Sequence, residues 1–333
     1  MQEKESKVNV LLMEGVAIFF VMFVHSGTPN KIYAFFSYGL SSLIFARGYQ
    51  WRERTFKELI KSRIQLLKTY YFAGLINSLA FLLVVPSKFL TTSKWNYFLN
   101  FLIGRLDKLD QIPITIVPLW FFLMLFFAEL MYWLLKKNGL ILALAVISSI
   151  LLRLFPHEPL PFKLDTAFSA IPFFVIGSIW KEKRYQVRLL DFILSVLGLV
   201  FISQTNGDIS WNNQWFGKNG LIAFLGEILA MFVIIYLADA IKTLKLDKFF
   251  YKISFNSLFI VSYHFLLGNL ISLPFILISG NLSDPMSVLH SFWYIHFPLV
   301  LILVFVCIQF IPQRVRSFLI GDFRRMKKGV RNS

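Results

Sequence analysis

The sequence predicts an all-α polytopic membrane protein, a bundle of about ten transmembrane helices with both termini in the cytoplasm. Three observations support this fold class. Of the 333 residues, 57% are hydrophobic and only 16% are charged, whereas a soluble protein carries roughly 25% charged residues. Ten apolar segments are about as long as a helix must be to cross a bilayer. Lysine and arginine also gather in alternate connections between those segments.

The predicted spans follow one another with short polar connections. The first lacks a following small-residue cleavage site, so we expect it to remain as a membrane anchor. The second carries serines and Gly39 and has the weakest apolar pattern. In chain order, the predicted spans are 8–26, 31–48, 64–86, 114–135, 139–155, 164–180, 188–204, 220–241, 253–279 and 290–311.

The polar stretches are too short for a separate soluble domain. Residues 1–333 are therefore expected to form one integral membrane domain, which ends in a basic cytoplasmic tail over 312–333. The run FRRMKKGVR in this tail is suited to anionic lipid heads. Residues 87–112 combine apolar side chains at helical spacing with scattered charges, so they lie in the outer interface or dip into the bundle.

The basic residues indicate the orientation of the bundle. With the N-terminus in the cytoplasm, 25 of the 34 Lys and Arg residues fall on the tails and the inner connections, and eight fall on the outer side. This asymmetry satisfies the positive-inside rule. The net charge of +16 therefore indicates membrane orientation, and nucleic-acid binding is a poor second explanation.

Several common types of functional site are missing from the sequence. A single cysteine, Cys307, excludes an internal disulfide. No HxxxH, HExxH or CxxC spacing is present, so we expect neither a metal nor a permanently bound cofactor. There is also no glycine-rich phosphate loop and no GxSxG nucleophile elbow. ATP hydrolysis and serine-hydrolase chemistry are therefore not expected.

Two ionisable residues lie on the first predicted span. Glu14 and His25 are eleven residues apart, which is about three helical turns, about 16 Å, and within roughly 20° of one face. Ionisable groups inside a membrane usually mark a pathway or a reaction site. The alternative is that Glu14 and His25 each lie near a membrane surface and are partly hydrated.

Other polar residues also fall within predicted spans. His264 lies in the middle of the ninth span, and Arg47 ends the second span at about the depth of Glu14. Their similar depth makes an ion pair between Glu14 and Arg47 plausible, and the simplest interpretation of such a pair is a purely structural role. The remaining residues of this kind are His296, Glu227, Glu129 and Asp239.

Four segments together resemble acyltransferase family 3, a family of integral membrane O-acyltransferases, and in particular its fucose 4-O-acetylase-like branch. The segments are EGVAIFFVMFVHS, FSYGLSSLIFARGYQWRE followed by KSRIQLLKTYY, PLWFFLMLFFAELMYWLL, and ISFNSLFIVSYHFLL preceded by IPFFVIGSIWKE. They occur in the family's order and cover the whole chain. The family's opening basic residue falls on Glu14, its upstream Asp on Leu11, the Ser of its SGY motif on Arg47, and the Pro before Tyr70 on Thr69.

The resemblance implies a function. It implies transfer of an acyl group, usually acetyl, from cytosolic acyl-CoA to a hydroxyl of a cell-surface polysaccharide or lipid-linked sugar, in the cytoplasmic membrane of a bacterium. His25, with Glu14 and His264, would form the catalytic site, because a histidine is a suitable general base at neutral pH. Basic residues would hold the CoA phosphates. The residues implied for the donor are Arg47, Arg52, Arg54, Lys57, Lys61, Arg63 and Trp120.

Two alternatives stay open at this point. A transporter or flippase for a polysaccharide precursor would also need many helices and buried polar groups, but it predicts paired broken helices, which the sequence does not reveal. A catalytically inactive relative, acting as a subunit of a glycan synthase, would explain Glu14 in place of the family's basic residue. Homo-oligomers and glycan-synthesis partners fit either case.

Overall fold

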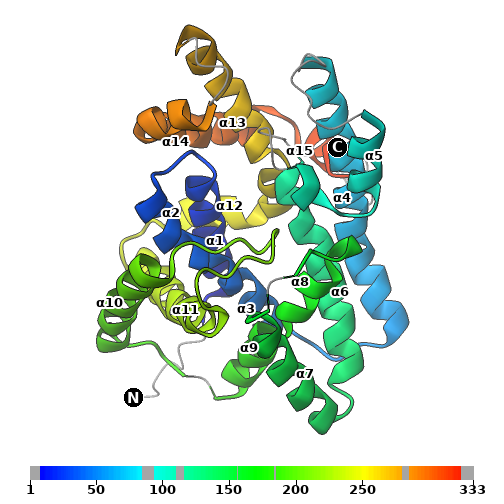
Figure 1. The fold of residues 1–333 in the computed structure, drawn as a ribbon, viewed down its shortest axis with the longest axis vertical. Helices are drawn as coiled ribbons and strands as arrows, with labels where there is room; N and C mark the ends of the chain where they lie inside the picture. Colours follow the sequence, from blue (N-terminus) through cyan, green and yellow to red (C-terminus); the bar gives the residue numbers. More distant parts are fainter. Residues whose placement is uncertain are drawn as a thin grey trace.

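The computed structural model describes residues 8–84, 94–109, 116–155, 157–183, 185–279 and 285–323. This part of the chain is helical, apart from loops and one isolated bridge between Ser210 and Trp215. Figure 1 shows the arrangement. The α-helices are α1 (Val10–Val24), α2 (Asn30–Ser37), α3 (Ser41–Tyr49), α4 (Phe56–Val84), α5 (Lys94–Leu102), α6 (Trp120–Leu135), α7 (Gly139–Leu152), α8 (Leu164–Ser169), α9 (Ile171–Lys183), α10 (Leu189–Asn206), α11 (Gly220–Thr243), α12 (Asp247–Phe255), α13 (Ser257–Ser279), α14 (Pro285–Phe310) and α15 (Gln313–Leu319). Short 3-10 helices are η1 (Tyr38–Leu40), η3 (Leu106–Leu109), η4 (Val117–Leu119) and η5 (Pro161–Lys163).

The helices indicate a membrane protein. Within the described ranges, four segments are long and apolar enough to cross a bilayer, and the count rises to six if each of two bent helix pairs is one span. The four are Val117–Leu135, Leu189–Asn206, Gly220–Thr243 and His290–Phe310. Within the described ranges, helical residues lie in each of the ten predicted spans. The count of ten crossings and the side of each terminus stay predictions.

Two helix pairs are bent where one uninterrupted span was expected. The η5–α8 segment meets α9 at 45°, and α12 meets α13 at 87°. Pro172 in the first turn of α9 restricts the preceding residue, which favours a restart of the helix there. At the second bend, Asn256 leaves helical geometry and its side chain donates to the carbonyl of Lys252. The sequence did not reveal these two bends.

Close helix contacts at the centre depend on glycine. Helices α3 and α9 pack so tightly that a Cβ on Gly48 would lie 2.2 Å from the carbonyl oxygen of Phe174. Likewise, a Cβ on Gly177 would lie 2.3 Å from the carbonyl oxygen of Phe45. Small residues are the usual means by which membrane helices approach closely. The second predicted span forms α2, η1 and α3, and its α3 part packs against α9 of the sixth.

The outward faces of α7 and α10 are apolar, as lipid contact requires. The exposed large side chains of α7 are Leu140, Ile141, Leu144, Ile147 and Leu151. Those of α10 are Leu189, Leu190, Ile193, Leu194, Leu197, Val200 and Phe201. The last residues of α10, from Ser203 on, are polar. The exposed apolar face therefore extends over nearly all of α7, whereas in α10 it stops at Phe201, before the C-terminal end of the helix.

The predicted interfacial segment is helical where the structure describes it. A hydrogen bond from the hydroxyl of Tyr70 on α4 to the carbonyl of Phe101 joins α5 to α4. Trp95, also on α5, is 67% exposed. The rest of 87–112 lies partly outside the described ranges. In the basic tail, α15 is described and is held by a hydrogen bond from Tyr263 to Leu319. Residues 324–333 of the tail also lie outside the described ranges.

Candidate active site

A cavity of about 380 Å³ lies at the end of α1. Its wall comes from α1, α2, the start of α6, the loop 207–219 between α10 and α11, α13 and α14. Histidines, aromatic rings, amides and hydroxyls make up its polar and aromatic lining. These residues are Phe20, His25, Ser26, Thr28, Tyr33, Phe36, Ser37, Trp120, Phe121, Ser210, Trp211, Asn212, Asn213, His264, Phe265, Asn269, His290 and His296.

The two histidines expected to be catalytic meet in this cavity. His25 caps the C-terminal end of α1, and His264 lies on α13. The Nδ1 atom of His25 is 2.8 Å from the Nε2 atom of His264. The two rings are stacked with their centroids 5.1 Å apart. Residues 239 positions apart in the sequence are therefore joined directly. Glu14, the third residue that the resemblance implied for the catalytic site, does not line this cavity.

The hydrogen bonds determine which nitrogen of each ring carries hydrogen. Nδ1 of His264 lies 2.9 Å from the carbonyl oxygen of Ile260, which can only accept. Nδ1 of His264 is therefore the donor, and its Nε2 is an acceptor. His25 must then donate from Nδ1 to that Nε2 atom, which leaves the lone pair of His25 on its own Nε2. An imidazole oriented in this way is suited to remove a proton.

Two further histidines hold the backbone that follows His25. His296 has one ring nitrogen 3.1 Å from the carbonyl oxygen of Ser26 and the other 3.0 Å from that of Gly268. His290 lies 2.9 Å from the carbonyl oxygen of Gly27. Because Gly268 is one helical turn beyond His264, α14 ties the segment that carries His264 to the segment that follows His25. The sequence marked His296 as a buried polar residue without this role.

The loop 207–219 closes one side of the cavity and is firmly anchored. Arg153, at the end of α7, forms an ion pair with Glu227 of α11, and both side chains are fully buried. The guanidinium carbon of Arg153 also lies 4.9 Å from the centre of the Trp211 ring. Nζ of Lys163 donates to the carbonyl of Asn212 at 2.8 Å. These contacts hold the cavity wall in place from behind.

The same anchoring cluster includes Asp107 near the predicted outer surface. Lys163 donates to its carboxylate at 2.9 Å, and Arg105 also binds it. Burial raises the pKa of the Asp107 carboxyl, but the hydrogen bonds from Arg105 and Lys163 outweigh burial and hold the pKa below its ordinary value. Sequence reasoning placed Arg153 and Lys163 among ordinary outer-side charges. Glu227 inside a span was the signal that a buried cation had to lie nearby.

A second, smaller cavity of about 30 Å³ lies near the other end of α1 and is lined by both Glu14 and Arg47. The expected Glu14–Arg47 ion pair is wrong, because no contact within 4.0 Å joins their charged atoms among the described residues. Glu14 instead accepts hydrogen bonds from Gln50 at 3.4 Å and Ser254 at 3.3 Å. The bend between α12 and α13 brings Ser254 to this carboxylate, and neutral donors then satisfy it.

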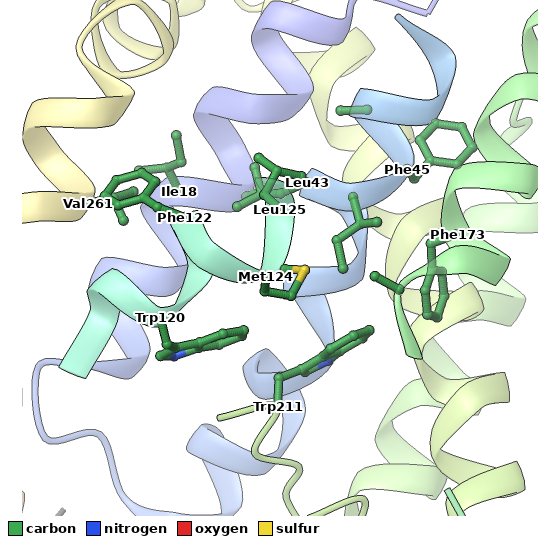
Figure 2. Packing of buried hydrophobic residues seen from close by; sticks show 14 of the residues in the cluster. Ile18, Leu43, Phe45, Trp120, Phe122, Met124, Leu125, Phe173, Trp211 and Val261 are labelled. Atoms are coloured by element: carbon green, nitrogen blue, oxygen red, sulfur yellow. The ribbon is translucent and has the colours of Figure 1, made fainter. Parts of the chain in front are cut away.

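Three side chains separate the two cavities. Leu43, Phe121 and Val261 line both of them. Figure 2 shows Val261 beside Phe122 and Ile18, with Leu43 next to Leu125. The indoles of Trp120 and Trp211 lie below Met124 at one level in the same view. A thin apolar partition thus lies between the histidine pair and the Glu14–Arg47 region.

The basic residues implied for the donor gather beyond the small cavity. Arg63 is paired with Glu129, whose side chain is 1% exposed. Arg47 and Arg54 also lie close enough to Glu129 to interact with its charge, so three guanidiniums surround one carboxylate. Arg52, Lys57 and Lys61 are exposed. Trp120, expected on the donor side, instead lines the large cavity with His25.

The described residues contain no group of three or more His, Cys, Asp or Glu side chains that could hold a metal ion. The four histidines of the cavity bond to one another or to backbone carbonyls.

No protein-family model, curated protein or solved structure matches this chain. The resemblance to acyltransferase family 3 therefore remains an expectation carried by the quoted segments.

Proposed function

We propose that the protein is a membrane O-acyltransferase that moves an acyl group, usually acetyl, from acyl-CoA to a hydroxyl of a cell-surface polysaccharide or lipid-linked sugar. The observation that carries this proposal is the His25–His264 hydrogen bond of 2.8 Å inside a cavity. His264, fixed by the carbonyl of Ile260, orients His25 so that its Nε2 lone pair is available as a general base.

The chemistry needs only a few steps. The acceptor hydroxyl gives its proton to Nε2 of His25 while its oxygen bonds to the thioester carbonyl carbon. The carbon–sulfur bond then breaks, and the CoA sulfur leaves and takes the proton back from His25. His264 keeps His25 in one tautomer throughout and shares the positive charge that His25 acquires, as the third member of a catalytic triad does.

The donor would approach from the end of α1 that carries Glu14. Arg47, Arg54 and Arg63 around Glu129 leave an excess of positive charge there, which suits the anionic phosphates of CoA. The thioester would pass Leu43, Phe121 and Val261 to reach His25. CoA is a substrate in this scheme and not a resident cofactor.

The proposed topology has ten membrane crossings in a bacterial cytoplasmic membrane, with both termini in the cytoplasm. The distribution of Lys and Arg supports it. In this orientation the Glu14 end of α1 faces the cytoplasmic acyl-CoA, and His25 faces the outer acceptor.

A transporter is the second candidate, because the structure contains two bent helix pairs. Substrate sites in transporters are typically formed by such breaks. The described lining of the large cavity, however, includes no residue from η5, α8, α9 or α12. The breaks therefore lie away from the cavity, which favours the acyltransferase.

The test compares the O-acyl content of surface glycans in cells that lack the protein and in cells that carry a chosen variant. His25→Ala is expected to lower acylation by about 10²- to 10⁴-fold, because a general base contributes that factor. His264→Phe is expected to lower it as well. His157→Ala is the matched control, because His157 lies outside the cavity lining.

Acylation that persists with His25→Ala at an unchanged protein level would contradict the proposed role of His25. Absence of acylation even with the unmodified protein would favour the transporter or the inactive relative.

A further inference from the structure

The wall of the large cavity carries no formal charge apart from its histidines. Among the described residues that line it, none is Asp, Glu, Lys or Arg. Aromatic rings, three amide side chains and several hydroxyls take their place. The three amides are Asn212, Asn213 and Asn269. Such a lining offers a ligand hydrogen bonds and apolar surfaces, but it offers no acidic or basic side chain to pair with a charged group.

Two buried cations behind this wall, Lys163 and Arg153, are already paired with carboxylates. Lys163 reaches the loop through the carbonyl of Asn212, but its ammonium is paired with Asp107 at 2.9 Å. Arg153 lies behind Trp211 and is paired with Glu227. Both cations are fully buried. Arg153 and Glu227 neutralise each other, and Lys163 is held by Asp107, which it shares with Arg105. Neither cation lines the cavity, so neither offers its charge directly to a bound anion.

The four histidines are also committed. His25 bonds to His264, and His264 bonds to the carbonyl of Ile260. His290 directs Nδ1 at the carbonyl oxygen of Gly27. His296 directs both ring nitrogens at carbonyl oxygens, those of Ser26 and Gly268, so the backbone takes its N–H groups and none is left for a ligand. A carboxylate beside His25 would hold its imidazole in the protonated form and so remove the base. The cavity therefore disfavours an anionic ligand both for binding and for chemistry.

We propose that the part of the acceptor that enters the cavity is an uncharged sugar residue, and that sugars carrying a carboxylate or phosphate at this position are rejected. This inference rests on the proposed function and narrows its substrate class. An anion that leaves water without a cation partner loses its hydration and gains little in return. For a lipid-linked sugar, the diphosphate must then remain outside the cavity.

The cavity volume of about 380 Å³ falls at the lower end of the range for small-molecule sites. It suits one or a few sugar residues at the end of a chain. The aromatic lining presents flat apolar surfaces to the C–H faces of a pyranose, and the amides and hydroxyls can bond its hydroxyl groups. Neutral sugars have both kinds of surface.

The experiment uses the full chain in lipid nanodiscs and matched pairs of acceptors. Each pair is a neutral methyl hexopyranoside and the corresponding methyl hexuronide, which differ only in CH₂OH against carboxylate. Binding is followed by tryptophan fluorescence, and transfer is followed with radiolabelled acetyl-CoA. We expect the neutral member to be used with a kcat/KM at least about a hundredfold higher, because unpaired burial of an ion costs several kcal/mol.

A charge placed at the cavity mouth should shift this preference. Asn213 is exposed and lines the cavity, so Asn213→Lys adds a cation there with little risk to folding. It is expected to raise the use of the hexuronide relative to its neutral partner by about fivefold, the effect of one exposed ion pair. Gln186→Lys adds the same charge at an exposed site outside the cavity lining and should leave the ratio as it is.

The outcomes separate the two proposals. Equal use of both members of a pair would overturn the neutral-acceptor inference and leave the acyltransferase standing. Binding of the neutral glycosides alone, without transfer, would support the inference and contradict the proposed function. Neither binding nor transfer for any pair would count against both.

Discussion

Arg153 and Glu227 show how single residues maintain the cavity from behind its wall. Both side chains are fully buried, and the guanidinium also donates to the carbonyl of Ser169 at 3.1 Å. Its carbon lies 4.4 Å from the centre of the Phe216 ring and 4.9 Å from that of Trp211. The aromatic faces and the carboxylate together replace the hydration that the guanidinium loses.

Removing one member of this pair should cost far more than removing both. Arg153→Met or Glu227→Leu alone is expected to destabilise the protein by about 3–5 kcal/mol, because a buried charge is left without its partner. The double variant is expected to recover most of that loss. Thermal unfolding in nanodiscs measures the coupling as a double-mutant cycle. Additive losses would show that the two side chains act independently.

At the scale of elements, α3 and α9 form one of the closest helix contacts in the described residues. Gly177→Ala would place a methyl group 2.3 Å from the carbonyl oxygen of Phe45, and backbone cannot move as easily as a side chain. We expect a loss of about 1–3 kcal/mol, the usual cost of overpacking. A lower melting temperature in nanodiscs would report it.

Gly139 provides the matched control for this prediction. It begins α7, and a Cβ there meets nothing within 4 Å. Gly139→Ala should therefore be neutral or slightly stabilising, because alanine favours the helix. Equal melting temperatures for Gly177→Ala and the unmodified protein would mean that α3 and α9 can separate without cost.

The helices themselves were predictable, because a chain in lipid must satisfy its backbone hydrogen bonds within each apolar segment. The resemblance placed His25 and His264 in one catalytic set with Glu14, but it did not predict the hydrogen bond between the two histidines. The bends at Ala170 and Asn256 and the partners of Glu14 were not predictable. They depend on how each helix rotates and where it breaks, and apolar periodicity does not encode either. The loop that contributes Trp211 to the cavity was missed for the same reason.

At the scale of the whole molecule, the two cavities lie near opposite ends of α1, with Leu43, Phe121 and Val261 between them. The proposed function uses this arrangement to keep donor and acceptor on opposite sides of the membrane. Transfer across the bilayer is therefore the property that most directly tests the arrangement.

Proteoliposomes provide that test. A neutral methyl glycoside is trapped inside, and acetyl-CoA is added outside, where it meets only those molecules whose basic face points outward. We expect acetylated glycoside to accumulate inside the vesicles, and His25→Ala to abolish it. The vesicles must remain impermeable to both substrates throughout. Product that forms only when donor and acceptor share one compartment would show that both substrates enter from one side.

The short apolar faces of α7 and α10 also bear on the lipid around the protein. With 14 residues, α7 is about 21 Å long at about 1.5 Å per residue, whereas the hydrocarbon core of a typical bilayer is about 30 Å thick. As one of the ten proposed crossings, α7 would require the lipid beside it to become thinner, at a cost of fractions of a kcal/mol per Å of mismatch. We therefore expect the protein to collect where acyl chains are short, and to dimple thicker membranes around itself.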